Sequence, residues 1–174
     1  MSSSDLRIAI SGKSGCGNST VSRLVADSLG LRVINYTFKD LARDSGMSFE
    51  ELSRRAETDT RYDLTIDRMQ IELARTGGYV LGSRLAIWLL RDMALTVYLS
   101  ASLEVRAERI ARREGGDYAV VLARTAERDA RDHDRYARLY GYDVERYEFA
   151  QLVVDTEELD QNGVARAIVD FARR

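Results

Sequence analysis

The chain has 174 residues, of which 45% are hydrophobic and 31% are charged, and its net charge is −2. This length and composition are typical of one globular domain, so we expect a single domain over residues 1–174. An acidic protein is poorly suited to general nucleic-acid binding, and no apolar run approaches the roughly 20 residues that cross a bilayer. We therefore expect neither nucleic acid nor a membrane as a partner.

The start of the chain, MSSSDLR, has none of the apolar segment typical of a signal peptide. The sequence has one cysteine, which cannot form an internal disulfide, and this agrees with a reducing compartment. We expect a cytoplasmic protein that acts as a monomer.

Five short apolar runs alternate with segments of helical periodicity. The runs predict strands that are covered on both faces of a parallel sheet, and they span Leu6–Ile10, Arg32–Ile34, Tyr79–Leu81, Leu95–Leu99 and Leu152–Val154. Helical periodicity covers Ser19–Leu29, Phe38–Ser45, Phe49–Ala56, Arg61–Arg75, Leu103–Glu114, Ala119–Tyr140 and Gly163–Ala172. This alternation favours an α/β fold with five parallel strands and helices on both faces.

The first strand runs into GKSGCGNST, residues 12–20, and then into a helix. This resembles the P-loop pattern, in which Gly, four residues, Gly and Lys precede Ser or Thr. Backbone N–H groups of such a loop and of the following helix start bind phosphate. Ser19 is the candidate Mg²⁺ ligand, and the expected phosphate-binding residues are Gly12, Lys13, Ser14, Gly15, Cys16, Gly17, Asn18, Ser19 and Thr20.

Asn18 occupies the position of the P-loop lysine, whose charge faces the β- and γ-phosphates. Another cation must replace that lysine, and the candidates are Lys13 in the same loop and arginines further along the chain. Two other interpretations stay open: an ordinary flexible loop, and a loop that holds nucleotide without turnover. We expect Cys16 to be a small filler of the loop.

Two helical stretches without strands, about residues 37–76 and 106–140, are candidate lids, because ligands bind at the carboxyl ends of parallel strands. Gly115–Gly116 interrupts the second stretch and is a candidate hinge. Arginines there recur at steps of four, three, four and three, which predicts one helix face carrying Arg124, Arg128, Arg131, Arg135 and Arg138. The preceding helix adds Arg106, Arg109 and Arg113.

The acidic residues between these arginines also fit a salt-bridged surface helix. We favour a lid that closes over phosphate and excludes water. Candidates on the acceptor side are fewer. Lys39, Asp67 and Arg68 lie in the first helical stretch, and Arg84 follows the third strand, where the sheet would direct it at the ligand cleft.

Over residues 7–155 the chain resembles the cytidylate kinases, in particular the short archaeal type within the P-loop nucleoside monophosphate kinase superfamily. The resemblance rests on LARDSGMSFEEL at 41–52, on LEVRAERIARREG at 103–115, and on residues 124–142 with their Arg-Tyr and Leu-Tyr-Gly segments. It implies transfer of the γ-phosphoryl group of ATP to CMP or dCMP, with Mg²⁺ as cofactor.

The resemblance also implies roles for individual residues. Residues 37–76 become the monophosphate-binding insert, and residues 106–140 become the lid. The catalytic arginines would be Arg109 and Arg113, on the donor nucleotide and its phosphates, and Arg128 and Arg135, which with Asp132 serve the acceptor sugar and the transferred phosphate. Lys39 and Arg84 would hold the acceptor phosphate.

Two features bear on the resemblance. The archaeal type itself lacks the loop lysine and has threonine there, so Asn18 fits the family. The family has Glu-Gly-Arg after the third strand, whereas this chain has Gly82-Ser83-Arg84. The alternatives are a kinase for another small acceptor, such as AMP or a non-nucleotide metabolite, and a nucleotide-binding regulator without turnover.

Overall fold

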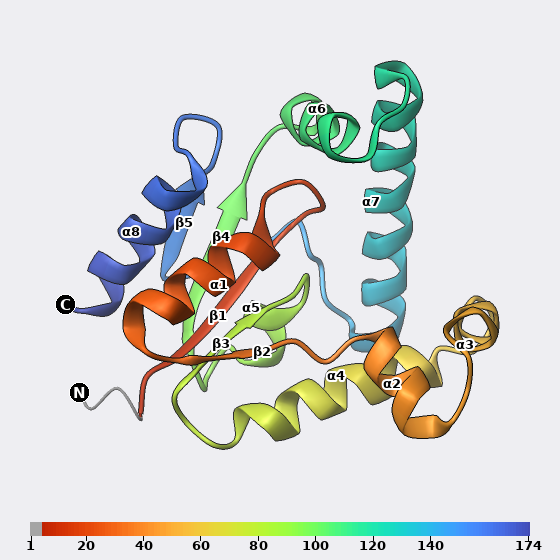
Figure 1. The fold of residues 1–174 in the computed structure, drawn as a ribbon, viewed down its shortest axis with the longest axis horizontal. Coiled ribbons are helices and arrows are strands. Elements are labelled where there is room, and N and C mark those ends of the chain that lie inside the picture. Colours follow the sequence, from red (N-terminus) through yellow and green to blue (C-terminus); the bar gives the residue numbers. More distant parts are fainter. Residues whose placement is uncertain (1–4) are drawn as a thin grey trace.

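The computed structural model describes residues 5–174, and its centre is a parallel sheet of five strands (Figure 1). The strands follow the order β2-β3-β1-β4-β5, and each neighbouring pair is parallel. Their bounds are β1 (Arg7–Gly12), β2 (Arg32–Ile34), β3 (Tyr79–Gly82), β4 (Leu95–Ser100) and β5 (Leu152–Asp155). The predicted fold class and all five predicted strands are confirmed.

Helices fill the connections between the strands. They are α1 (Asn18–Leu29), α2 (Phe38–Ser45), α3 (Phe49–Ala56), α4 (Arg61–Ala74), α5 (Ala86–Leu89), α6 (Leu103–Glu114), α7 (Tyr118–Tyr140) and α8 (Gln161–Ala172). The sequence predicted seven of these to within two residues at each end. Helix α5 was missed because its four residues lie in a continuous apolar run that has no helical period.

Both faces of the sheet are buried, which explains why the strand sequences are nearly all apolar. Alternate residues of β1 point to opposite faces. Ile8 and Ile10 pack with α1 and α8, whereas Ala9 belongs to a second cluster with Tyr79, Trp88 and Tyr98. The resulting three layers hold the carboxyl ends of the strands at a common edge.

The two predicted helical stretches lie beside that edge. Helices α2, α3 and α4 follow β2, and α6 and α7 follow β4. Figure 1 shows α7 running from α6 at one end to α2 and α4 at the other. Helix α7 of the second stretch therefore reaches the helices of the first. No helix within residues 5–174 is long and apolar enough to cross a membrane.

Candidate active site

The loop between β1 and α1 turns on two glycines. Gly15 and Gly17 have φ angles of 92° and 96°, in the left-handed region that side chains other than glycine rarely adopt. A Cβ on Gly15 would lie 2.8 Å from the Cβ of Arg106, so α6 packs directly on the loop. Gly17 ends the turn, and its carbonyl oxygen accepts hydrogen bonds from the N–H groups of Thr20 and Val21 at 3.1 and 3.0 Å.

The side chain of Asn18 faces the loop itself. Its Nδ2 donates to the carbonyl oxygen of Gly12 at 2.6 Å. Its Oδ1 is buried and has no hydrogen-bond partner among the described residues. The hydrogen bond from Asn18 to Gly12 closes the loop. Because the amide is neutral, it does not replace the positive charge of a P-loop lysine.

Two other loop residues differ in burial. Cys16 is 3% exposed, and burial raises the pKa of its thiol to about 11, so the side chain is an inert filler. Ser19 lies exposed in the first turn of α1, where its hydroxyl is free to face a ligand.

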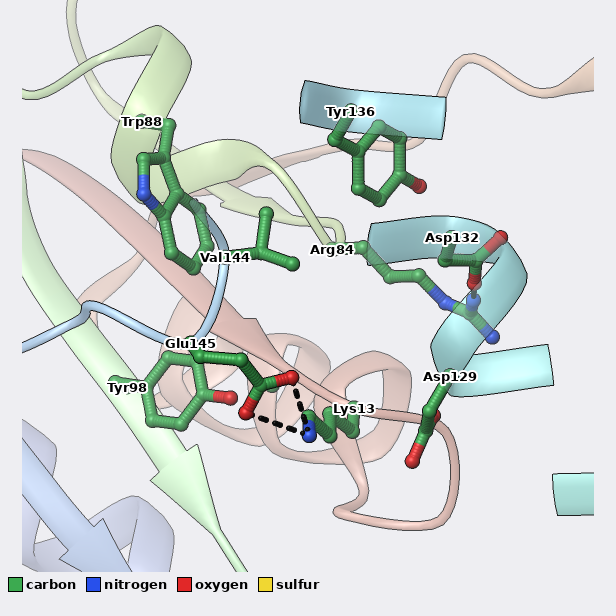
Figure 2. A pocket seen from close by; sticks show the side chains of 10 residues that line it. Lys13, Arg84, Trp88, Tyr98, Asp129, Asp132, Tyr136, Val144 and Glu145 are labelled. Carbon is green, nitrogen blue, oxygen red and sulfur yellow. Dashed lines mark hydrogen bonds and ion pairs between the residues drawn. The ribbon is translucent and has the colours of Figure 1, made fainter. Parts of the chain in front are cut away.

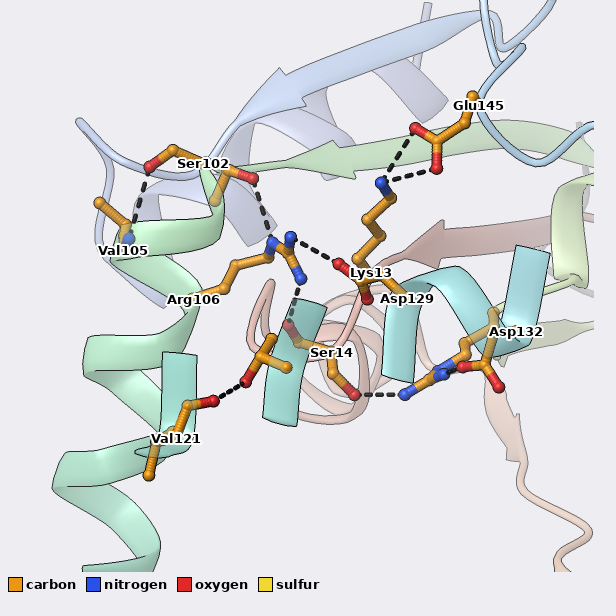
Figure 3. Close-up of polar contacts among 12 residues, drawn as sticks. Lys13, Ser14, Ser102, Val105, Arg106, Val121, Asp129, Asp132 and Glu145 are labelled. Atoms are coloured by element: carbon orange, nitrogen blue, oxygen red, sulfur yellow. Dashed lines mark hydrogen bonds and ion pairs between the residues drawn. The ribbon is translucent and has the colours of Figure 1, made fainter. Parts of the chain in front are cut away.

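Arg106 and Arg109 of α6 tie this helix to the loop, and Figure 3 shows the contacts of Arg106. The guanidinium of Arg106 is almost fully buried, pairs with Asp129 of α7 at 2.7 Å, and donates to the carbonyl oxygen of Ser14 at 3.2 Å. Arg109 donates to the carbonyl oxygen of Gly15 at 3.4 Å and to the hydroxyl of Thr156 at 2.9 Å. Both arginines therefore stabilise the loop through its carbonyl oxygens.

A chain of alternating charges runs along α7. Arg84, which follows β3, pairs with Asp132 and donates to the hydroxyl of Ser14. Arg135 contacts Asp132 at 3.5 Å and pairs with Asp63 of α4 at 3.0 Å. Burial and the nearby charge of Arg128 lower the pKa of Arg84 to about 10. The crowding of positive charge around a desolvated arginine is typical of a site that takes an anion.

Two pockets meet at Arg84 and Tyr136, which line both of them. The larger, of about 150 Å³, lies between α4 and α7, and its other lining residues are Phe38, Asp63, Ile66, Asp67, Ser83, Leu85 and Arg135. The smaller one adjoins the loop (Figure 2) and is lined by Gly12, Lys13, Trp88, Tyr98, Asp129, Asp132, Val144 and Glu145. Arg84 thus lies where a ligand of one pocket would meet a ligand of the other.

The structure adds Glu145 to the residues considered from sequence. It lies between α7 and β5, and its carboxylate oxygens are 2.7 and 2.9 Å from the Nζ of Lys13. Lys13 and Glu145 are 132 positions apart, and Glu145 lies in a segment without periodicity. No sequence signal could therefore have predicted their contact. Asp63 was missed for a similar reason, since only the packing of α4 against α7 brings it to Arg135.

Several expected residues lie away from the pockets. Arg113 is exposed and pairs with Glu114, and Lys39 is exposed near the ring of Phe49. The arginine face of α7 is only partly directed inward. Arg135 lines the larger pocket and Arg128 is exposed close to Arg84, whereas Arg124, Arg131 and Arg138 are exposed. The buried face of α7 carries Val121, Thr125, Asp132 and Tyr136 instead.

The absence of a carboxylate at Gly82 has a structural counterpart. A Cβ on Gly82 would collide with the side chain of Ser22, whose Cβ would be only 2.9 Å away. Ser22 of α1 is buried and occupies the space that a larger residue on β3 would need. The glycine and the serine therefore form a matched pair.

The site fits a magnesium ion that arrives with a nucleotide. No cluster of three or more His, Cys, Asp or Glu side chains within residues 5–174 could hold a metal alone. Mg²⁺ commonly keeps several waters and binds through few protein groups and the phosphates of a substrate. The exposed hydroxyl of Ser19 would supply such a single protein contact.

The glycine loop, the helix that follows it and the arginines around it define a phosphotransferase site on a P-loop fold. The solved structure of shikimate kinase from Bacteroides thetaiotaomicron supports the fold, with a TM-score of 0.68, 16% identity, and coverage of 97% of this chain and 99% of that one.

Comparison of the sequences identifies the family. The Cytidylate kinase-like family matches residues 7–158. The chain is 43% identical to cytidylate kinase 2 of Borreliella afzelii over 169 residues, which cover 95% of each protein. It is 42% identical to the cytidylate kinase of Aeropyrum pernix over 168 residues, covering 95% of this chain and 98% of that one. The chain belongs to the Cytidylate kinase-like family.

We predict that Gly15→Ala destabilises the protein more than Gly46→Ala does. Both glycines have positive φ angles, of 92° and 70°, and both variants incur the conformational cost of roughly 1 kcal/mol. Only at position 15 does the new Cβ also meet Arg106, whereas nothing lies within 4 Å at position 46. Urea unfolding of the two variants measures the difference, and equal losses would contradict the close packing of loop and helix.

Asp67→Asn should stabilise the protein at pH 7. The hydroxyl of Tyr140 donates to Asp67, but burial raises the pKa of this carboxyl above its ordinary value. A raised pKa means that the folded state binds the proton more tightly, so ionisation at neutral pH costs stability. The gain in Tm should shrink as the pH falls and the wild-type carboxyl is protonated. Asp27→Asn, on the exposed side of α1, is the control and should change Tm little at either pH.

Proposed function

We propose that this protein is a cytidylate kinase that transfers the γ-phosphoryl group of ATP to CMP or dCMP, giving ADP and CDP or dCDP. The observation that carries the proposal is the position of Arg84, which lies at the junction of the two pockets and contacts the loop through Ser14. A phosphate held by Arg84 would lie next to a phosphate held by the loop. Membership of the family supports the choice of a nucleotide acceptor.

The reaction is an in-line displacement. An oxygen of the acceptor phosphate attacks the γ-phosphorus of ATP, the bond from that phosphorus to the β–γ bridging oxygen breaks, and ADP leaves. No general base is needed because the attacking oxygen is already anionic. Catalysis then rests on positioning and on neutralising the charge on the transferred group. When bound with ATP, Mg²⁺ would neutralise part of that charge.

The residues divide between the two substrates. The loop, residues 12–20, binds the phosphates of ATP, and Arg109 supports it from α6. Arg84, Arg128 and Arg135 surround the acceptor phosphate, while Asp132 holds Arg84 and Arg135 in place until the ligands arrive. The buried Arg106–Asp129 pair keeps α6 and α7 joined at the loop, and the exposed side chains of Arg113 and Arg128, on either side of Gly115–Gly116, turn inward over the bound phosphates. Residues 37–76 hold the monophosphate.

A panel of acceptors tests the proposal. Release of ADP from ATP and Mg²⁺ is followed with CMP, dCMP, UMP, AMP and shikimate. We expect the largest kcat/KM with CMP or dCMP. A larger value with AMP or shikimate would identify a kinase for another acceptor. ATP binding without acceptor-dependent release of ADP would identify a nucleotide-binding regulator.

Arg135→Ala and Arg128→Ala should each lower kcat by about 10²–10³-fold, the usual loss when one group that stabilises transition-state charge is removed. Arg138→Ala is the matched control, since this arginine lies on the same helix but is exposed. Circular dichroism should show an intact fold in all three variants. Wild-type rates in both Arg128→Ala and Arg135→Ala would refute the lid.

A further inference from the structure

The glycine loop lacks a cation at its own lysine position. Asn18 is neutral and donates to Gly12, so it offers no charge to a bound triphosphate. Between residues 12 and 20 the one ionisable cation is Lys13. The whole sequence has only two lysines against 24 arginines, so this flexible ammonium differs from every other cation at the site.

Lys13 is also held more loosely than Arg106 and Arg109, the two arginines that contact the backbone of the loop. Arg106 and Arg109 donate to the loop carbonyl oxygens and are anchored by Asp129 and Thr156. The ammonium of Lys13 has one partner among residues 5–174, the carboxylate of Glu145, and the two side chains are 30% and 50% exposed. An ion pair as exposed as this contributes little to stability. A triphosphate carries several negative charges and can therefore compete with Glu145 for the ammonium of Lys13.

The partner of Lys13 is fixed more firmly than Lys13 itself. Tyr147, two residues after Glu145, stacks on Tyr98 of β4 with ring centroids 3.8 Å apart. Phe149 packs edge-on against Trp88 at 5.8 Å. These contacts attach the segment between α7 and β5 to β4 and α5, while the four-carbon stem of Lys13 can change rotamer. Figure 2 shows the Lys13–Glu145 pair in the same pocket as Arg84 and Asp132.

We propose that Lys13 supplies the phosphate-binding cation that Asn18 lacks, and that Glu145 is a positioning residue that holds Lys13 until the triphosphate binds. In the bound state the ammonium leaves Glu145 and contacts the β- and γ-phosphates from the pocket that it shares with Arg84. The inference rests on the proposed function and adds to it a pair of residues that exchange partners with the ligand.

Variants at positions 13 and 18 test the cation. With wild-type turnover of CMP established first, Lys13→Ala should lower kcat at least 100-fold and weaken ATP binding, whereas Lys13→Arg should keep at least a tenth of the rate. Lys13→Ala combined with Asn18→Lys should be at least tenfold faster than Lys13→Ala combined with Asn18→Leu, because both double variants lose the hydrogen bond from Asn18 to Gly12 but only the first regains a cation. A Lys13→Ala rate within threefold of wild type would overturn the proposal, and so would equal rates for the two double variants.

Glu145→Gln tests the positioning residue. Since ATP no longer has to break the pair, KM for ATP should fall two- to fivefold at unchanged kcat. Glu148→Gln, an exposed glutamate on the same segment, is the matched control and should leave both constants unchanged. A rise in KM or a fall in kcat for Glu145→Gln would instead mean a purely structural contact and would overturn this part.

Calorimetric titration of each variant with ATP and Mg²⁺ separates the two proposals. If the wild type binds ATP but turns over no acceptor, the proposed function fails. The weaker binding of Lys13→Ala and the tighter binding of Glu145→Gln can still be measured in that case. Thermal unfolding of each variant confirms that the fold is kept.

Discussion

Positive charge crowded around a glycine loop must be neutralised when no phosphate is bound, and this requirement shapes the site. Guanidinium groups held close together in a partly dry environment repel one another. Burial lowers the pKa of Arg84, and the nearby charge of Arg128 lowers it further. Each of four cations at the site is paired with a carboxylate. The pairs are Arg84–Asp132, Arg106–Asp129, Arg135–Asp63 and Lys13–Glu145.

The four ion pairs differ in burial, and this difference separates the pairs that stay closed from those that can open when a ligand binds. Arg106 and Asp129 are almost fully buried, so removing either one would leave an uncompensated charge, which is strongly destabilising. Lys13 and Glu145 are much more exposed, and their pair can open at little cost. Helix α7 contributes to three of the four pairs. Helix α7 therefore connects the loop side of the site to α4. Because its residues line both pockets, any movement of α7 changes the shape of both.

The fold could be predicted from sequence because its signals are local. Short β-branched runs and helical periods fixed five strands and seven helices, and only α5 was too short to show a period. The site was less accessible. Steps of four and three place five arginines on one broad face of α7. The apolar residues of the helix then determine which side of that face points inward. Packing around Val121 and Tyr136 turns Arg135 to a pocket and leaves Arg131 and Arg138 in solvent.

Some contacts between distant segments could not be predicted. The sequence named Lys13 as a possible substitute for the loop lysine, but it contained nothing that pointed to Glu145. Asn18 was recognised as a departure from the P-loop pattern, yet its inward hydrogen bond to Gly12 depends on a loop geometry that only coordinates provide.

The matched pair of Gly82 and Ser22 limits which single substitutions these two positions accept. A side chain at position 82 needs a smaller neighbour on α1, whereas Ser22 fills that space here. An acidic side chain added at position 82 alone would bring its Cβ within 2.9 Å of the Cβ of Ser22, whereas removing the hydroxyl of Ser22 alone deletes a buried polar atom that has no hydrogen-bond partner among the described residues. The order of substitution therefore matters: position 22 must become smaller before position 82 can carry a larger side chain.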